Sequence, residues 1–293
     1  MAVKGIAMKY YLGIDIGGMT VKGILTDGSG KIYAEGSVPT DSDKGAEIMC
    51  ENIARLVAEL TEGVNKEEIA GAGVGCPGLI DSADGTVVFA GNLNLKNFPL
   101  AKEIEKRCGF KVRLTNDANA AALGEAKFGA GSKYKNSVLI TLGTGVGGGI
   151  VIDGKLFEGG KSAGTEIGHT VIVENGLKCT CGRRGCFERY ASARALMKQT
   201  KEAMEGNRNS EMWKEYDLAT VSGKTPFAYY DRDLTAKLVV DKYIKHLACG
   251  ILNMINIFRP EVVMLGGGVS EQGETLTKPL QKIIDAELFG GTE

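Results

Sequence analysis

The spacing of apolar and polar positions along the chain predicts short strands that alternate with helices. Three apolar stretches separated by glycine turns open the sequence, which is typical of an antiparallel β-meander. Apolar residues at helical spacing then predict an amphipathic helix, followed by a buried strand, a helix, another strand and an alanine-rich helix. In order, these elements are Tyr10–Ile16, Val21–Asp27, Lys31–Val38, Lys44–Glu62, Ile69–Gly78, Leu100–Cys108, Lys111–Asp117 and Ala118–Gly129.

The opening pattern returns later in the chain at a constant offset of 126 residues. Ser137–Leu156 again consists of a strand, a glycine turn, a strand and a turn. Glycine is common in this sequence, so one match means little, but four matches together with the phase of the strands indicate two related halves. The four matches are Gly17 with Gly143, Gly23 with Gly149, Asp27 with Asp153 and Gly28 with Gly154. The apolar pairs that set the phase are Leu12 with Val138, Ile14 with Ile140 and Ile24 with Ile150.

A long helix over Leu234–Phe258 and a strand over Glu261–Ser270 complete the second half. The order of meander, helix, strand and helix therefore occurs twice, which predicts an α/β protein of two lobes with a cleft between them. We expect the boundary near Asp117, so that residues 1–117 form an N-terminal lobe and residues 118–293 form a C-terminal lobe.

Composition excludes several classes of function. The chain has 293 residues, of which 43% are hydrophobic, so it can bury a sizeable core. A net charge of -1 argues against nucleic-acid binding through phosphate contacts. No apolar run approaches the roughly 20 residues that cross a membrane, and the N-terminus lacks a signal-peptide core. The odd number of cysteines favours a reducing cytoplasm, with Cys50, Cys76, Cys108 and Cys249 as small buried hydrophobes.

Two glycine turns carry candidate chemistry. The stretch "GTGVGG", Gly143–Gly148, satisfies a dinucleotide-binding pattern, but in that fold the glycines open a helix, whereas here β-branched alternation follows. The glycines then join two strands, and the exposed backbone N–H groups of such a turn can hold phosphate. "DIGGMT", Asp15–Thr20, is the same device with an added carboxylate that could organise Mg²⁺. Together the turns predict a nucleoside triphosphate site, with two ordinary glycine hairpins as the alternative.

At this point the sequence resembles a known family. The segments "DIGG", "PGLID", "TNDANAAALGE", "TLGTGVGGGIVIDGKL", "EIGH", "CTCGRRGCFERYAS" and "MLGGGVS" have the order and spacing of the ROK family (repressor, open reading frame, kinase) over residues 10–275. The resemblance implies a two-lobed, actin-like ATPase (ribonuclease H-like) fold with an interlobe cleft. It also implies ATP- and Mg²⁺-dependent phosphorylation of a hexose, first of all of glucose at its 6-hydroxyl. N-acetylmannosamine, N-acetylglucosamine and fructose are the alternative substrates, and a dimer or tetramer is expected.

The resemblance assigns individual site residues as well. Asp117 in "TND" would be the general base, although a carboxylate between a strand and a helix is also explained as an N-cap. Glu188 alone is also explained as a solvated residue at a helix start. The expected sugar ligands are Gly78, Asn92, Asn116, Asp117, Glu166, His169 and Glu188. The expected nucleotide contacts are Asp15, Gly17, Gly18, Thr20, Gly143, Thr144 and Gly145, with Gly266 and Gly267 against the adenosine.

The segment Glu166–Ser192, called the clip segment below, holds three of the seven cysteines and one of the two histidines. A disulfide knot, a catalytic metal centre and a structural metal clip are the three interpretations. His169, Cys179, Cys181 and Cys186 complete a tetrahedral zinc site and leave no open position, which a catalytic zinc needs. A Cys-x-Cys pair is poorly placed for a disulfide. We therefore expect a structural Zn²⁺ clip, with the second ring nitrogen of His169 free to meet a sugar hydroxyl.

Three features depart from the family pattern. Met19 takes the place of the threonine in the usual D-I-G-G-T, and Thr20 follows it. Thr165 stands before Glu166, where glycine is usual. The family normally continues beyond "AELFGGTE" with another short strand and a closing helix, so the resemblance implies either a truncated C-terminal lobe or a domain that ends unusually.

Two other classes of function compete with a sugar kinase. A sugar-responsive repressor of the same family would carry a helix-turn-helix domain ahead of the first hairpin, where this sequence has about nine residues. The presence of Asp117 also favours catalysis. An NAD-dependent dehydrogenase depends on the glycine turn alone, and that hypothesis fails unless a helix follows Gly148.

Overall fold

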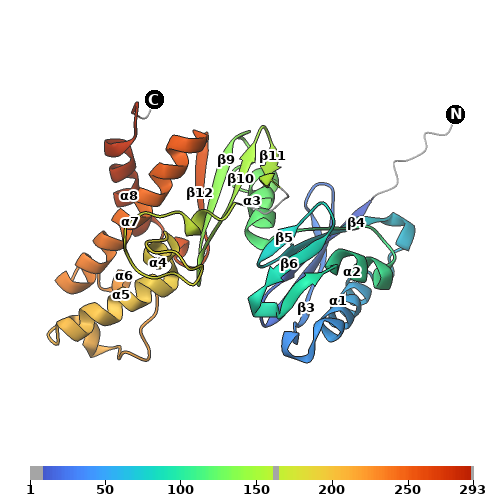
Figure 1. Ribbon diagram of the computed structural model, residues 1–293, viewed down its shortest axis with the longest axis horizontal. Helices are drawn as coiled ribbons and strands as arrows, with labels where there is room; N and C mark the ends of the chain where they lie inside the picture. Colours follow the sequence, from blue (N-terminus) through green and yellow to red (C-terminus); the bar gives the residue numbers. More distant parts are fainter. Residues whose placement is uncertain (1–8, 161–164, 292–293) are drawn as a thin grey trace. The chain divides into compact units, whose positions relative to one another are not determined.

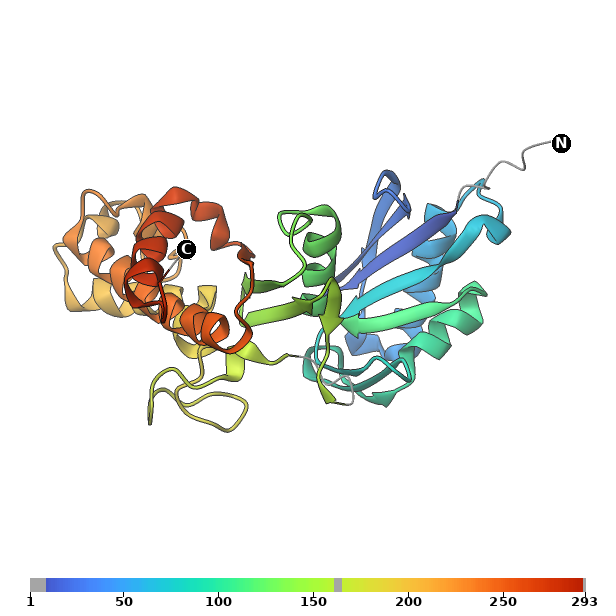
Figure 2. The ribbon, with the colours of Figure 1, turned by 90° about the horizontal axis from the view of Figure 1, so that it is seen from above.

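A computed structural model describes residues 9–160 and 165–291, and the chain divides into two compact units (Figures 1 and 2). The first unit comprises the described residues up to Ser132 together with 155–160 and Thr165. The second comprises Lys133–Gly154 and the described residues from Glu166 onward. The expected boundary after Asp117 falls inside the first unit, because the helix that begins there packs against strands of that unit.

The first unit is built on a five-stranded sheet of order β3-β2-β1-β4-β8. The first three strands form the predicted antiparallel meander, and β4 pairs in parallel with both β1 and β8. The helices α1 and α2 pack against each other, and α3 packs on β4 and β8. The bounds are β1 Tyr10–Ile16, β2 Thr20–Asp27, β3 Ile32–Pro39, α1 Ala46–Leu60, β4 Ile69–Cys76, α2 Leu100–Cys108, β8 Val112–Asn116 and α3 Asp117–Phe128.

Glycines make room for α1 on this sheet. Gly23 of β2 faces Gly36 of β3 across the antiparallel pair. A Cβ at Gly23 would lie 2.7 Å from a methyl carbon of Leu60, and one at Gly36 would lie 3.0 Å from a methyl carbon of Leu56. Both leucines are buried in the core. The absence of side chains on the two strands thus lets the apolar face of α1 approach the backbone of the sheet.

A second, smaller sheet of order β5-β6-β7 follows β4, and the sequence pattern did not predict it. Its strands are short, which leaves too few alternating positions for a period of two to stand out. The side chain of Asp81 accepts hydrogen bonds from the backbone N–H groups of Ala83 and Asp84 and so closes the β5–β6 turn. The strands are β5 Leu79–Asp81, β6 Thr86–Ala90 and β7 Leu95–Phe98, with the 3-10 turn η3, Gly91–Leu93, between the last two.

The second unit repeats the centre of the first. β9 pairs antiparallel with β10 and parallel with β12, as β1 pairs with β2 and β4. Helices α5, α7 and α8 enclose a second core. The bounds are β9 Ser137–Leu142, β10 Val146–Ile152, α4 Glu188–Ala191, α5 Ala193–Gly206, α6 Thr225–Ala228, α7 Leu234–Phe258, β12 Val262–Gly266 and α8 Glu274–Glu287. The short strand β11, Lys155–Phe157, belongs to the first unit, where it contacts α3.

The turns of the two hairpins differ in length, which the constant offset between the two halves did not reveal. Ile16 pairs with Val21 around residues 17–20, whereas Leu142 pairs with Val146 around residues 143–145. The second turn is therefore the tighter one. The predicted strand over Glu261–Ser270 is also shorter than expected, because Gly267 has a φ of +83° and turns the chain away after Gly266.

The helix α7 crosses the second core next to the clip segment. Gly250 on α7 faces the ring of Phe187, which is 1% exposed, and a Cβ at Gly250 would lie 2.3–2.6 Å from three ring carbons. Gly250 is therefore the point where α7 leaves room for the aromatic ring that precedes α4.

No helix in the described ranges combines the length and apolar character that crossing a membrane requires.

We expect Gly250→Ala to lower the free energy of unfolding by about 1–2 kcal/mol. Alanine normally stabilises a helix by roughly 0.5–1 kcal/mol relative to glycine, but overpacking a core costs about 1–3 kcal/mol. Gly206→Ala is the matched control in the same unit, because a Cβ there meets no atom within 4 Å. Urea unfolding of both variants is the measurement, and equal or greater stability of Gly250→Ala would contradict the packing argument.

Candidate functional site

Two predicted site carboxylates come together at the carboxyl ends of β1 and β8. Asp15 pairs with Gly75 of β4, and Gly75 pairs with Thr115, two residues before Asp117. A Cβ at Gly75 would lie 3.9 Å from Oδ1 of Asp15 and 3.5 Å from the Cα of Asp117. Partial desolvation, and then the negative charge of Asp117, raise the pKa of Asp15. Gly75, which the sequence reasoning missed, thus separates two carboxylates that repel each other.

The structure decides which residue caps α3. Oδ1 of Asn116 accepts hydrogen bonds from the backbone N–H groups of Ala118 and Asn119, at 2.9 and 3.3 Å, so Asn116 is the N-cap. The alternative interpretation of Asp117 as the N-cap is therefore wrong. Asp117 is the first residue of α3, and its Oδ1 accepts a hydrogen bond from the N–H of Ala118 at 2.9 Å. The carboxylate lies at a helix N-terminus, where the helix dipole favours negative charge.

The amide of Asn116 also fixes the neighbouring loop. Its Nδ2 donates to the carbonyl oxygen of Gly78 at 3.2 Å. Gly78 has a φ of +102°, and a Cβ there would lie 2.3 Å from the carbonyl oxygen of Phe89. The position therefore requires glycine on both steric and conformational grounds. Two of the expected sugar ligands, Gly78 and Asn116, are in direct contact.

The first glycine turn is closed and braced within the first unit. The N–H of Gly17 donates to the carbonyl of Thr20 at 3.0 Å. Thr40, which is fully buried, donates its hydroxyl to the carbonyl of Gly17 at 2.7 Å and its N–H to the carbonyl of Met19 at 3.0 Å. The side chain of Met19 is 87% exposed, so its backbone rather than its side chain shapes the turn. Sequence reasoning missed Thr40, which stands outside every motif.

Asn92, another expected sugar ligand, lies beside this turn. It is exposed in η3, and a Cβ at Gly18 would lie 3.8 Å from its Nδ2. On the other side of the site, the hydroxyl of Thr115 donates to Oε1 of Glu158 at 2.9 Å. The first unit therefore gathers Asp15, Gly17, Gly18, Thr20, Gly78, Asn92, Asn116 and Asp117 around the ends of β1, β4 and β8.

The second glycine turn joins two strands. The N–H of Gly143 donates to the carbonyl of Gly145 at 3.0 Å, and Thr144 between them is exposed. The strand β10 follows at once, so the dinucleotide-binding hypothesis, which required a helix after Gly148, is wrong. Gly148 serves packing instead, because a Cβ there would lie 2.1 Å from a methyl carbon of Ile167.

The glycines after β12 lie against the same turn. Gly266 pairs with Thr141, and a Cβ at Gly267 would lie 2.6 Å from the carbonyl oxygen of Leu142. The N–H of Val269 donates to that oxygen at 3.4 Å. The expected phosphate and adenosine contacts of the second unit are thus brought together by the parallel pairing of β9 and β12.

Glu188 faces the second turn. Its Oε2 accepts a hydrogen bond from the N–H of Val146 at 3.3 Å, and a Cβ at Gly145 would lie 2.2 Å from this oxygen. The N–H of Ala193, just after α4, donates to the carbonyl of Gly143 at 2.8 Å. Glu188 does begin a helix, but the carboxylate is half-buried against the turn, so the interpretation of a simply solvated residue is wrong.

The four expected metal ligands converge. One ligand atom from each of His169, Cys179, Cys181 and Cys186 lies within 4.8 Å of the others. Nδ1 of His169 lies 3.6 Å from Sγ of Cys179, and Sγ of Cys181 lies 3.6 Å from Sγ of Cys186. All of these cysteines are free thiols, which contradicts a disulfide knot. Burial, and then the neighbouring Cys181 and Cys179, raise the pKa of Cys186 to about 12, a repulsion that a bound cation would relieve.

The orientation of His169 links this cluster to Glu166, one of the expected sugar ligands. With Nδ1 toward the thiols, Nε2 lies 4.0 Å from Oε2 of Glu166. The guanidinium of Arg183 donates to the carbonyl of His169 at 3.3 Å, which ties the hairpin of the cluster to η5, Ile167–His169. Three thiols and an imidazole form a donor set that suits tetrahedral Zn²⁺ and close its coordination sphere.

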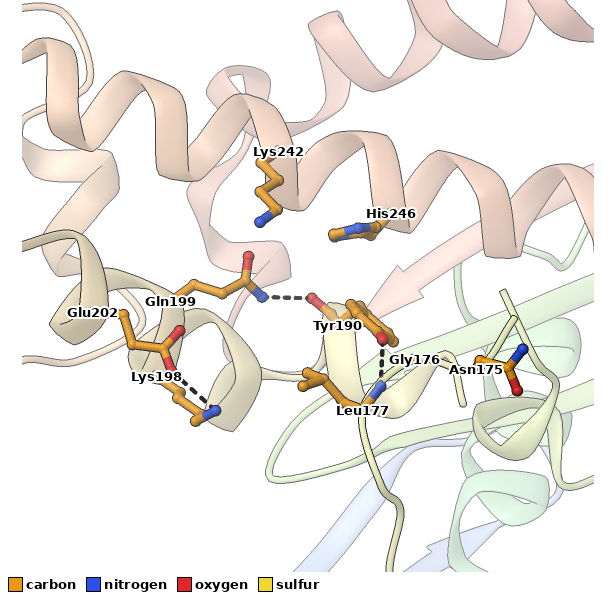
Figure 3. Close-up of a pocket in the computed structure, with 9 residues that line it drawn as sticks. All are labelled: Asn175, Gly176, Leu177, Tyr190, Lys198, Gln199, Glu202, Lys242 and His246. Carbon is orange, nitrogen blue, oxygen red and sulfur yellow. Dashed lines mark hydrogen bonds and ion pairs between the residues drawn. The ribbon is translucent and has the colours of Figure 1, made fainter. Parts of the chain in front are cut away.

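A separate cavity of about 480 Å³ lies between the clip segment and the helices α5 and α7, and none of the expected site residues lines it (Figure 3). Its wall shows how α4 is held in place. The N–H of Leu177 donates to the hydroxyl of Tyr190 at 2.7 Å, and Nε2 of Gln199 donates to the carbonyl of Tyr190 at 3.0 Å. The ring of Tyr190 lies against His246 of α7, with the ring centres 4.8 Å apart.

Comparison with known proteins places the chain in a family. The sequence model of the ROK family matches residues 11–293. A glucokinase of Halalkalibacterium halodurans is 38% identical over 95% of this chain and 86% of its own length, and a glucokinase of Thermotoga maritima is 39% identical over 94% and 87%. The crystal structure of a ROK family glucokinase from Streptomyces griseus with glucose and AMPPNP has a TM-score of 0.81 at 34% identity, over 97% of this chain and 90% of that one.

The chain therefore belongs to the ROK family. The predicted fold class is confirmed, since the two related α/β units are those of the actin-like ATPase fold.

The brace on the first turn can be tested directly. We expect Thr40→Val to lower the free energy of unfolding by about 1–3 kcal/mol, because it removes the hydroxyl that the fully buried Thr40 donates to the carbonyl of Gly17. Thr40→Ser keeps the hydroxyl and is the matched control. Urea unfolding compares the two, and a valine variant as stable as the serine variant would show that the hydroxyl does not support the turn.

Proposed function

We propose that this chain is a glucokinase that transfers the γ-phosphoryl group of ATP to the 6-hydroxyl of glucose. The chain is an ATP-dependent sugar kinase by its family and by its similarity to two glucokinases. The choice of glucose follows those relatives and the glucose complex of the Streptomyces griseus enzyme. N-acetylmannosamine, N-acetylglucosamine and fructose are the other substrates to be tested.

The observation that carries the chemistry is the pair of carboxylates at the ends of β1 and β8. Phosphoryl transfer leaves the protein little covalent work, so it needs alignment, one base and stabilisation of charge. Asp117 would take the proton from the 6-hydroxyl as that oxygen attacks. Its position at the start of α3, fixed by the cap of Asn116 on that helix, would hold the carboxylate in place.

Asp15 is the carboxylate that would bind Mg²⁺. Its pKa is raised by partial desolvation and by the charge of Asp117, so a cation beside it would relieve the repulsion between the two carboxylates. Mg²⁺ usually binds through one or two carboxylates and retained water, and it neutralises charge on the phosphates. Asp15 would hold the ion, while Asp117 stays available to the sugar.

The two glycine turns would bind the phosphates through backbone N–H groups, which need no side chain and tolerate close approach. In the first unit these come from Gly17, Gly18 and Thr20, and in the second from Gly143, Thr144 and Gly145. Gly266, beside Leu139 and Thr141, and Gly267, packed on Leu142, would contact the adenosine. Carboxylates and amides suit the sugar, because each accepts or donates hydrogen bonds in fixed directions.

We also infer that the metal of the clip segment is structural zinc. The four ligand atoms already lie close together, and they leave no open position for a reacting water. The ion would fix the ring of His169, with Nε2 turned toward Glu166 and the sugar. It would therefore support sugar binding without touching phosphate.

Turnover of a panel of sugars tests the proposal. In a coupled assay of ADP release, we expect glucose to give the highest kcat/KM among hexoses and N-acetylhexosamines. Asp117→Asn should lower kcat by about 10²–10⁴-fold with little change in KM, because it removes the base and keeps the shape. Asp84→Asn, at an exposed position of the same unit, is the control and should keep wild-type turnover.

Wild-type turnover by Asp117→Asn would refute the assignment of the base. A higher kcat/KM for an N-acetylhexosamine would refute glucose as the substrate. Specific binding of operator DNA without any turnover would instead favour the repressor of the same family.

Metal analysis tests the zinc clip. We expect about one zinc per chain in the wild type and much less in Cys179→Ser, which should also raise the KM for the sugar by roughly 10-fold or more through loosening of the segment. Cys249→Ser, on α7 and outside the cluster, should keep both the metal and the KM. A wild-type protein that folds and turns over without zinc would contradict the assignment.

A further inference from the structure

We infer that Glu188 couples sugar binding to nucleotide binding, by leaving the second glycine turn when a sugar engages its carboxylate. The inference rests on the proposed function, because it takes the turn as a phosphate site and Glu188 as a sugar ligand. It adds a role that neither assignment contains. Without sugar, the carboxylate occupies the turn and opposes the nucleotide; with sugar, it is drawn away.

The first support is the contact itself. Oε2 of Glu188 accepts the N–H of Val146, the residue that closes the turn, at 3.3 Å. In the part of the chain that the structure describes, this is the one hydrogen bond recorded for the carboxylate. The oxygen also lies where the side chain of any residue other than glycine at position 145 would project. The carboxylate therefore uses the backbone surface that a phosphate would use.

The second support is that the backbone around Glu188 is held by contacts that do not involve its carboxylate. The carbonyl of Ala191 accepts the hydroxyl of Tyr243 at 2.7 Å, and Phe187 is seated against Gly250. Tyr190 is held by Leu177 and Gln199 (Figure 3). The residue just before Phe187 is the metal ligand Cys186. A change of partner at Glu188 is therefore a change of side-chain rotamer, which needs no movement of α4.

The third support is the sign of the charge. A carboxylate next to the turn repels a phosphate, and its hydrogen bond occupies a donor that the phosphate needs. This free-energy cost of nucleotide binding is removed when sugar hydroxyls donate to the carboxylate and draw it away from the turn. Binding of one ligand then favours the other, and linkage makes the coupling equal in both directions. The same arrangement would limit wasteful hydrolysis of ATP in the absence of sugar.

Titration of the full-length protein with AMPPNP and Mg²⁺, with and without saturating glucose, tests the inference. For the wild type, we expect glucose to lower the Kd of AMPPNP by about tenfold, which lies within the usual range of coupling between two sites. For Glu188→Ala without sugar, AMPPNP should already bind about tenfold more tightly than to the wild type, and glucose should have little further effect. Glu188→Gln, which keeps an acceptor and loses the charge, should bind several-fold more tightly without sugar.

Glu205→Ala is the matched control. It removes an exposed carboxylate of α5 in the same unit, outside every expected site, so both the sugar-free Kd for AMPPNP and the effect of glucose on it should stay at the wild-type values. Zinc content and the midpoint of thermal unfolding show whether each variant is folded.

Sugar-free AMPPNP binding by Glu188→Ala that is weaker than, or equal to, that of the wild type would overturn the inference. It would show that the carboxylate is a fixed brace of the turn or plays no part in it. A wild type that binds AMPPNP equally with and without glucose would also overturn it, while leaving the kinase intact. A wild type that binds no AMPPNP at all would refute the proposed function itself.

Discussion

The parallel register of β1, β4 and β8 is the constraint on which the chemistry of the first unit depends. Because β4 lies between the other two strands, the carboxyl ends of all three meet at one edge of the sheet. That edge receives Asp15 from β1 and Asp117 from the helix that follows β8, and Gly75 of β4 lies between them. The same geometry brings two like charges near each other and raises the pKa of Asp15, and the proposed Mg²⁺ would offset that repulsion.

The two related units support their glycine turns with different side chains. Each places a glycine turn between the first two strands of a sheet and a parallel strand beside the first. The longer turn of the first unit is supported by an uncharged hydroxyl from Thr40, whereas the tighter turn of the second is supported by the carboxylate of Glu188. A neutral support is compatible with a bound phosphate at all times, but a charged one is not. If Glu188 acts as we infer, the two turns differ in their response to sugar as well as in their length.

Periodicity predicted the elements that are long or buried. The helices Leu100–Cys108 and Leu234–Phe258 and the strand Tyr10–Ile16 have the predicted bounds, because each offers enough apolar positions for its period to be recognised. The strands β5 to β7 are too short for that, and Asp81 closes their first turn through its side chain. Convergence of the four metal ligands followed from their spacing. The role of Thr40 could not be predicted, since it depends on a contact with a turn far away in the sequence. The cap of α3 is local, but Asn116 and Asp117 are both preferred cap residues, so the pattern could not choose between them.

The shortness of α4 has a consequence for how the second unit loses its order. A helix of four residues has too few internal hydrogen bonds to persist by itself. Its order comes from the hydroxyl of Tyr243, from the space at Gly250 and from the thiol cluster next to it. We expect such a segment to open at lower free energy than the helices α5 and α7 that it packs on. Hydrogen exchange and proteolysis would then begin there, while the surrounding core remains intact.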